Sequence, residues 1–391
     1  MKEILASSQP DLIDAEFSQE RGQIVWVDRD AKLWVADVNR RTGSIVPSDG
    51  KGQLVDPAAL RLSEVVGLTY NGPEWVPAAD GVYIAYTKFL PGRPRTLVNA
   101  RLAIARQLAD GTWEPRILQP ELARNAPYAS NDPGDPSPRI TYVDPAYNHF
   151  WRDIDRPAGE EKIPDVPQTP KSVRFVNGAR AAVFVAAAFG VQQVFRYDLD
   201  TKQLEQLTFD DGDKDIETVP WMWAAPEFDG SFVLMTVVDR NLLRFYRLLP
   251  LPRGGLAWLP FDQREFPTGA TVWSPEPFVY QGQSYAFMGL AVPPNNFSSE
   301  IWFVNLNELR PFMRRLDDPT LFKARMDPEA FVTELGPFIY YNRFDPTKVP
   351  GMPLRPTGHE GVYRAHTGLA QPPHMVGPAD NPGPRAVPSG L

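Results

Sequence analysis

The sequence of 391 residues contains no cysteine, which excludes disulfide bonds, thiolate metal sites and a cysteine nucleophile. Its first residues, MKEILASSQPDLIDAEF, lack the apolar core of a signal peptide, and no later run is apolar for long enough to span a membrane. We therefore expect a cytoplasmic protein without a membrane partner. A signal peptide that had already been removed would leave the same record, so a processed secreted form is the alternative.

Several well-known functional motifs are also missing. The sequence has no Gly-x-Gly-x-x-Gly that opens a helix, no P-loop and no Gly-x-Ser-x-Gly elbow, which argues against nucleotide-dependent enzymes and α/β-hydrolases. The net charge of −8 argues against nucleic-acid binding, because phosphate contacts need a basic surface. The four histidines show no metal-binding spacing such as His-Glu-x-x-His.

Proline, glycine and aromatic residues are abundant instead. The 42 prolines, 28 glycines and 12% aromatic residues indicate many short strands joined by tight turns. Seven apolar strand pairs recur at a mean spacing of roughly fifty residues, which suits a repeating unit of about four strands. Their first strands start near Ile24, Val82, Ile140, Ala182, Phe232, Tyr285 and Phe338. The sequence thus predicts an all-β fold, a seven-bladed β-propeller, with six or five blades and insertions as the alternatives.

The domain organisation follows from the extent of the repeats. We expect a single β-propeller domain over residues 1–369 and a tail rich in proline and glycine over residues 370–391. Residues 2–7, KEILAS, would supply the outer strand of the last blade and so close the ring. One short helix is expected within residues 305–326, NLNELRPFMRRLDDPTLFKARM.

One blade resembles a known repeat. The stretch QQVFRYDLDTKQLEQLTFDDGDK, residues 192–214, is similar to TolB-type propeller repeats, in which an Asp-containing turn separates a YDLDT strand from a QLTFD strand. The stretch KLWVADVNRRTG, residues 32–43, is a looser copy. The resemblance implies a propeller fold and no particular chemistry.

A segment opening with proline precedes each strand pair. We expect each proline to begin the innermost strand of a blade, where its missing N–H breaks no hydrogen-bond ladder. The seven dipeptides are Pro10-Asp11, Pro73-Glu74, Pro127-Tyr128, Pro170-Lys171, Pro226-Glu227, Pro275-Glu276 and Pro328-Glu329. The innermost strands of a propeller start at one mouth of its central channel. The catalytic carboxylates predicted at that mouth are Glu74, Glu227, Glu276 and Glu329.

Two of these openings carry a second resemblance. The stretches NGPEWVPAADGVYIAYTKF (71–89) and APEFDGSFVLMTVV (225–238) are similar to inner-strand openings of the five-bladed arabinanase and xylosidase glycoside hydrolases. In that family an acidic residue at this place faces the substrate. The resemblance implies a carbohydrate as the substrate.

Clustered carboxylates have a chemical consequence of their own. Four such groups cannot all ionise cheaply, so they must share protons, meet an Arg or Lys, or hold a divalent metal ion. Carboxylates whose pKa values differ can divide acid and base roles, as glycoside cleavage requires. We therefore predict a monomeric hydrolase or lyase acting on a small polar molecule such as a carbohydrate. The alternative is a non-catalytic propeller that binds a protein or ligand, in which each glutamate accepts backbone N–H bonds from the neighbouring blade.

Further side chains are expected around the same mouth. Aromatic residues beside the glutamates would stack on a sugar ring or hold a cationic amine. The long loops between the second and third strands of each blade would open on this face. One of these loops is predicted to carry a histidine suited to acid or base chemistry. The predicted substrate-binding residues are Asp11, Trp75, Tyr128, His149, Phe228, Asp239, Arg240 and Arg343.

Overall fold

The computed structural model describes thirteen ranges of the chain. They are residues 3–9, 12–28, 30–47, 52–59, 71–78, 81–90, 92–94, 96–130, 138–154, 159–169, 173–306, 310–347 and 355–369. The predicted tail, residues 370–391, lies outside them.

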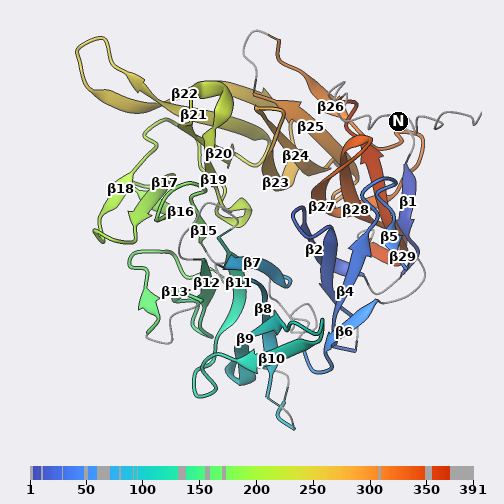
Figure 1. The fold of residues 1–391 in the computed structure, drawn as a ribbon. Coiled ribbons are helices and arrows are strands. Elements are labelled where there is room, and N and C mark those ends of the chain that lie inside the picture. Colours follow the sequence, from blue (N-terminus) through green and yellow to red (C-terminus); the bar gives the residue numbers. More distant parts are fainter. Residues whose placement is uncertain are drawn as a thin grey trace, which may run out of the picture.

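Seven antiparallel sheets surround one axis and form the blades of a propeller (Figure 1). Blades 1 to 3 contain, from the inside outward, β2 (Ile13–Ser18), β3 (Gln23–Val27), β4 (Leu33–Val38), β5 (Ile45–Val46) and β6 (Gln53–Asp56); β7 (Glu74–Ala78), β8 (Gly81–Phe89), β9 (Ala100–Gln107) and β10 (Trp113–Ile117); and β11 (Asn125–Ala129), β12 (Arg139–Val143), β13 (His149–Asp153) and β14 (Glu161–Lys162).

The remaining blades follow the same plan. Blades 4 to 7 contain β15 (Arg174–Phe175), β16 (Ala181–Ala188), β17 (Val191–Asp198) and β18 (Leu204–Gln206); β19 (Trp221–Ala225), β20 (Ser231–Val238), β21 (Leu242–Pro250) and β22 (Leu256–Glu265); β23 (Thr271–Tyr280), β24 (Gln283–Ala291), β25 (Glu300–Asn305) and β26 (Met313–Arg315); and β27 (Ala324–Thr333), β28 (Gly336–Thr347), β29 (Arg355–His366) and β1 (Ile4–Ser7). The predicted all-β fold with seven blades is confirmed.

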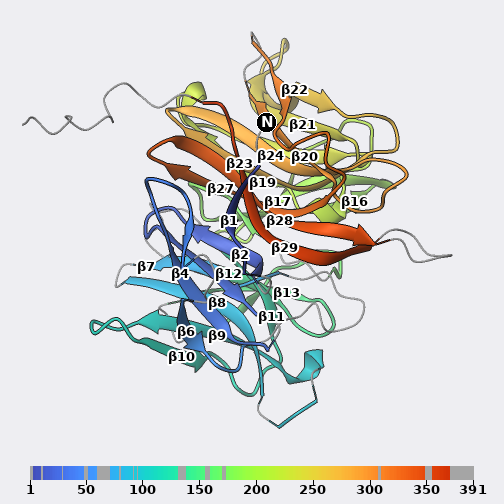
Figure 2. The same ribbon diagram turned by 90° about the vertical axis from the view of Figure 1, so that its right-hand side faces the viewer.

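The N-terminal strand closes the ring, as predicted. Strand β1 pairs antiparallel with β29, with Ile4 opposite Arg364, so the last blade combines both ends of the described chain (Figure 2). The buried carboxylate of Glu3, just before β1, accepts hydrogen bonds from Arg325 Nε at 2.7 Å and from the Tyr341 hydroxyl at 2.8 Å. Glu3 therefore fastens the closing strand to blade 7.

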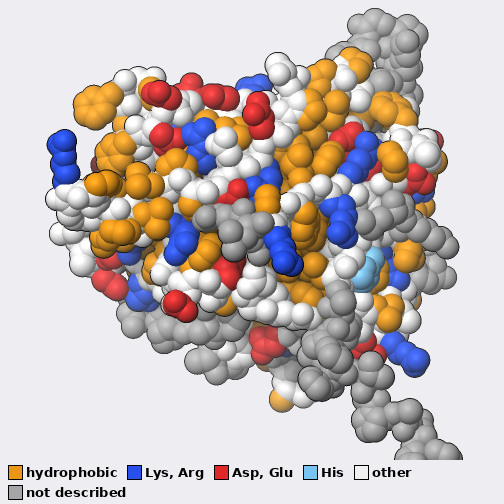
Figure 3. Space-filling view, turned by 90° about the horizontal axis from the view of Figure 1, so that it is seen from above, with side chains coloured by type: hydrophobic (Ala, Val, Ile, Leu, Met, Phe, Trp, Pro, Cys, Tyr) orange, Lys and Arg blue, Asp and Glu red, His pale blue; other side chains and the backbone are white. Residues whose placement is uncertain are grey.

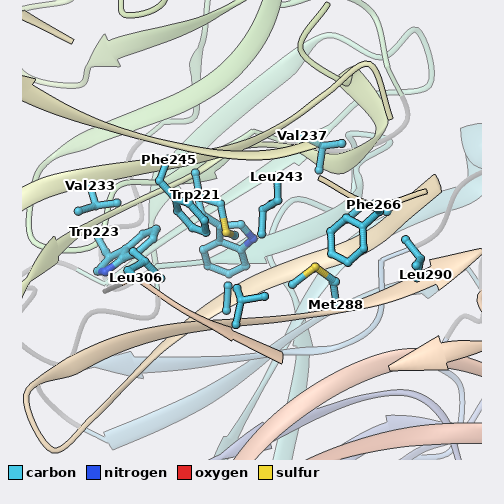
Figure 4. Close-up of a cluster of buried hydrophobic side chains, with 14 of the residues drawn as sticks. Trp221, Trp223, Val233, Val237, Leu243, Phe245, Phe266, Met288, Leu290 and Leu306 are labelled. Carbon is cyan, nitrogen blue, oxygen red and sulfur yellow. The ribbon is translucent and has the colours of Figure 1, made fainter. Parts of the chain in front are cut away.

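The core is divided among the contacts between blades. Seven clusters of buried apolar side chains each join two neighbouring blades, because strands in the middle of a blade are covered on both faces. The cluster between blades 5 and 6 includes Trp221 and Phe245 from blade 5 and Met288 and Leu290 from blade 6 (Figure 4). Closure of the ring thus gives every blade two apolar neighbours.

Helical structure is limited to three short 3-10 turns in the described ranges, η2 (Leu97–Asn99), η3 (Ile216–Thr218) and η4 (Pro226–Phe228). The short helix expected within residues 305–326 is not found in the described part of that segment, where β26 and turns occur instead. No helix among the described residues has the length and apolar character needed to cross a membrane. Acidic, basic and apolar side chains are interspersed on the side of the molecule seen in Figure 3.

Candidate functional site

Bulges in the innermost strands direct particular side chains toward the propeller axis. Three innermost strands, β11, β23 and β27, each contain a bulge where their pairing with the next strand shifts. At each bulge one residue has a positive φ and is followed by a proline. These residues are Ala126 (φ 52°), Ser274 (φ 42°) and Asp327 (φ 50°). A left-handed backbone conformation costs free energy in a residue that has a side chain. Strained bulges of this kind cluster at functional sites, so their presence in three blades indicates that the residues beside them belong to one. The residues after the prolines are Tyr128, Glu276 and Glu329.

These side chains belong to a set with one member from each innermost strand, which we call the axial ring. The proximity of its members is seen in their ion pairs, ring contacts and mutual effects on pKa. In order of blade, the axial ring consists of Glu16, Glu74, Tyr128, Arg174, Trp221, Glu276 and Glu329. The ring contains four carboxyl groups and one cation. The structure therefore brings together three of the four predicted glutamates, with Glu16 as the fourth carboxyl group.

Arg174 provides the positive charge of the axial ring. Its guanidinium lies 3.8 Å from the centre of the Trp221 ring and 4.7 Å from that of Tyr128. It also forms an ion pair with Glu276 at 3.5 Å. Arg174, from blade 4, therefore contacts blades 3, 5 and 6 near the axis, and its planar head matches the two aromatic faces.

Glu74 is the most deeply buried carboxyl group of the ring, with 4% of its surface exposed. It accepts a hydrogen bond from the side-chain amide of Asn71 at 2.8 Å and one from the backbone N–H of Ala129 in blade 3. Burial raises the pKa of Glu74 from 4.5 to about 7; the charge of Glu276 adds to this rise, while the Asn71 hydrogen bond and Arg174 oppose it. Glu74 therefore exchanges its proton near neutral pH.

The pKa of Glu329 is also raised. Burial raises the pKa of Glu329 well above its usual range, and the charges of Glu16, Glu276 and Glu74 raise it further, against the opposing effect of Arg174. The axial ring thus contains two carboxyl groups, Glu74 and Glu329, whose pKa values are raised by burial and by acidic neighbours.

A cavity of about 240 Å³ reaches the ring between blades 1 and 2. We call it the Glu74 cavity; it is lined by Glu16, Phe17, Ser18, Gln19, Glu20, Glu74, Trp75, Pro77 and Val82. Two of these residues, Gln19 and Glu20, belong to the turn that joins the innermost strand β2 to the second strand β3. In an antiparallel blade those turns lie on the face opposite the loops between second and third strands. The cavity therefore opens on the face opposite the long loops that the sequence predicted as its walls.

Glu227 does not join the axial ring. Strand β19 ends at Ala225, and Pro226 begins the turn η4, so the prediction that Pro226 opens an innermost strand is wrong. The prediction is also wrong for Pro127, Pro275 and Pro328, which lie inside β11, β23 and β27 rather than at their first residues. The Glu227 carboxylate accepts hydrogen bonds from the backbone N–H and the hydroxyl of Ser284 in blade 6, both at 2.9 Å. This is a clamp between two blades, the arrangement that the non-catalytic alternative expects.

The predicted aromatic residues occupy different places. Tyr128 belongs to the axial ring, and Trp75 lines the Glu74 cavity, where its indole N–H donates to the backbone oxygen of Glu16 at 3.0 Å. Phe228 lies in η4 instead, and the guanidinium of Arg247 covers its ring at 3.7 Å. Two of the three aromatic side chains are therefore placed near Glu74.

His149 and Arg343 serve the packing of their own blades. His149 begins strand β13 rather than lying in a loop, and its Nε2 is 3.0 Å from the backbone oxygen of Pro167. Burial lowers its pKa to about 4, so His149 is neutral at physiological pH. Arg343 pairs with Glu3 at 3.1 Å and covers the ring of Tyr363 at 3.4 Å, as part of the closing contact of blade 7.

Asp239 and Arg240 form the turn between β20 and β21, on the face opposite the Glu74 cavity. They line a separate cavity of about 390 Å³ together with Asp213, Lys214, Asp215 and Ile216. One carboxylate oxygen of Asp239 accepts the backbone N–H of Asp213 at 3.0 Å. The remaining predicted residue, Asp11, lies outside the described residues.

A metal site is not evident in the parts of the chain that the structure describes. No group of three or more His, Asp or Glu side chains within them is arranged to hold a metal ion. The residues that sequence reasoning missed are Glu16, Arg174 and Trp221. Trp221 follows Pro220, as Tyr128, Glu276 and Glu329 follow their prolines, so this dipeptide was a signal in the sequence that could have marked it. The described pairing of β15 and β19 with the next strand shows no register shift, and no proline directly precedes Arg174.

Comparisons with known proteins concern the fold alone. No protein-family model matches the chain, and no curated protein matches it. The similar solved structures include the Cps50 (Swd1) β-propeller domain of Myceliophteria thermophila, with 10% identity, a TM-score of 0.48 and coverage of 93% of this chain and 97% of that one. They also include TolB from Acinetobacter baumannii, with 16% identity, a TM-score of 0.37 and coverage of 89% and 79%. Similarity this low says nothing about activity or ligand.

Proposed function

We propose that this propeller is an enzyme that performs acid–base chemistry on a small polar substrate, a carbohydrate, bound in the Glu74 cavity. The observation that supports this most is that Glu74, which lines the cavity, has its pKa raised to about 7 by burial. A general acid or base works best when its pKa lies near the working pH. Glu74 would then donate or accept the proton at the reacting oxygen.

A second carboxyl group faces the same cavity. Glu16 lines it from blade 1, opposite Glu74 in blade 2. Glycoside cleavage uses two carboxyl groups in different protonation states, one as the acid and the other as base or nucleophile. We assign the proton donor to Glu74 and the second role to Glu16. Glu329 in blade 7, beside blade 1, and Glu276 in blade 6 would influence the charge of this pair.

The walls of the cavity favour a sugar. Trp75 and Phe17 supply apolar rings, which can stack on the apolar face of a pyranose, beside polar Ser18 and Gln19. The volume of about 240 Å³ is smaller than that of most drug-sized pockets and suits a single sugar ring. Among the described residues that line this cavity there is no Lys or Arg, so we expect a neutral substrate rather than an acidic one.

The test is a panel of 4-nitrophenyl glycosides and their free monosaccharides, assayed for release of nitrophenol and for a shift in melting temperature. We expect turnover of at least one glycoside and a pH–rate profile with one limb near pH 7. Glu74→Gln should lower the rate by at least about a hundredfold, because a general acid contributes about that much. Glu114→Gln is the matched control, since Glu114 is exposed on the outer strand of the same blade.

The second candidate is a non-catalytic propeller. The observation that favours it is that Glu74 and Glu227 each accept hydrogen bonds from the next blade, through Ala129 and Ser284. In that case Glu74→Gln would lower the melting temperature. The wild-type protein would cleave no glycoside, and no glycoside or monosaccharide would raise its melting temperature. Light scattering would test the expected monomer in the same samples.

A further inference from the structure

We infer that Arg174 is a positioning residue for this site: fixed between two aromatic rings on the axis, it controls the proton on Glu74 without contacting the substrate. The catalytic consequence rests on the proposed function, whereas the control of Glu74 does not. Arg174 does not line the Glu74 cavity. It acts through charge, from blade 4, with only blade 3 between it and Glu74.

The geometry holds the guanidinium in one place. Trp221 and Tyr128 lie 3.8 and 4.7 Å from it, and Glu276 pairs with it at 3.5 Å. Only 17% of the Arg174 side chain is exposed, and its Nε makes no hydrogen bond within the described structure. The two aromatic contacts and the ion pair therefore hold the charge in place. A lysine at this position would keep the charge but lose the planar contact with both rings.

The position of this charge matters because the axial ring has no other basic member. Four carboxyl groups approach the axis from blades 1, 2, 6 and 7, and Arg174 is the one cation among the seven ring residues. Its charge opposes the rise in pKa of both Glu74 and Glu329. Without Arg174, Glu276 would lose this ion pair, and the effect that opposes the rise in the pKa of Glu74 would be removed. Glu74 would then keep its proton to higher pH.

The experiment is a pH titration of the carboxylic acid C=O stretch by infrared difference spectroscopy. The Glu74 band is assigned by its loss in Glu74→Gln. In the wild-type protein we expect a midpoint near 7. Arg174→Met keeps an apolar side chain against the rings but removes the charge, so the midpoint should rise by about one pH unit or more, the usual effect of a nearby opposite charge. Arg174→Lys keeps the charge, so its midpoint should move by less.

Each outcome decides the inference. An unchanged or lower midpoint in Arg174→Met overturns it, as does a Lys variant that shifts as far as the Met variant, since packing rather than charge would then be responsible. If Arg174→Met does not fold, the Lys variant alone still decides, because a shift of one unit or more with the charge retained contradicts the inference. Arg116→Gln, an exposed change on β10, is the control and should leave the midpoint unchanged.

The outcome also separates this inference from the proposed function. A Glu74 midpoint that moves in Arg174→Met, in a protein that cleaves no glycoside, supports the role of Arg174 and contradicts the enzyme. Turnover whose pH limb stays at the same pH in Arg174→Met supports the enzyme and overturns the role of Arg174. Where turnover is found, the limb should move with the infrared midpoint.

Discussion

The raised pKa of Glu74 predicts that one neutral substitution removes a pH dependence of stability. A buried carboxyl group with a pKa of about 7 when folded and an ordinary value of 4.5 when unfolded binds its proton more tightly in the folded state. Folding stability therefore falls as the pH rises from about 4.5 to about 7 and is constant above that range. Glu74→Gln cannot ionise, so it should not show this loss.

The magnitude follows from the two pKa values. The difference between 7 and 4.5, at about 1.36 kcal/mol for each pKa unit, corresponds to about 3.4 kcal/mol in all. Part of this is already lost at pH 5, so between pH 5 and pH 8 the folded state should lose about 2.5 kcal/mol through Glu74 alone. Any hydrogen bond lost in the variant, such as that from Asn71 or Ala129, costs the same at both pH values. Relative to the wild type, the variant should therefore gain about 2.5 kcal/mol between pH 5 and pH 8.

Urea unfolding followed by tryptophan fluorescence at the two pH values measures this change, since the chain has ten tryptophans. Glu114→Gln, exposed on β10, serves as the control, and its free energy of unfolding should change with pH as that of the wild type does. If the free energy of unfolding of Glu74→Gln also changes with pH as that of the wild type does, Glu74 titrates as an ordinary glutamate. The electrostatic account of the axial ring would then be refuted, and with it the main support for the proposed acid.

Three further predictions concern stability. Glu227→Ala should cost roughly 2–3 kcal/mol in urea unfolding, because Ser284 loses a charged acceptor for both its N–H and its hydroxyl; a cost below about 0.5 kcal/mol would contradict the clamp. Burial acts to raise the pKa of Glu3, but its hydrogen bonds and ion pairs, chiefly with Arg325, lower it overall, so its contribution is present at neutral pH and lost as the pH falls below about 4.5. Glu3→Gln should therefore cost about 3 kcal/mol at pH 7 and much less at pH 3, and a cost independent of pH would argue against this. Ser274→Gly should stabilise the fold by roughly 0.5–1 kcal/mol by relieving the left-handed backbone at φ 42°, and destabilisation would show that the Ser274 side chain contributes more than the strain removes.

The proline pattern shows how much of the site could be predicted from the local sequence. Pro275 and Pro328 do precede axial glutamates, because each follows a bulge residue in the left-handed region that turns the next side chain inward. Pro226 precedes Glu227 in the same dipeptide yet lies in a 3-10 turn after the innermost strand. The dipeptide is identical in all three places. What differs is the backbone of the residue before it, which the letters of the sequence do not reveal.

The sequence by itself determined the all-β class, the seven repeats and the closing strand, since each depends on local alternation of apolar residues and on turns that recur along the chain. Only the tertiary structure decided the composition of the site. Arg174 lies about a hundred residues from Glu74 and from Glu276, and the three meet because closure of the ring brings all the innermost strands to one axis. The pKa of Glu74 is likewise a property of burial and of charges from other blades, so it exists only in the closed propeller.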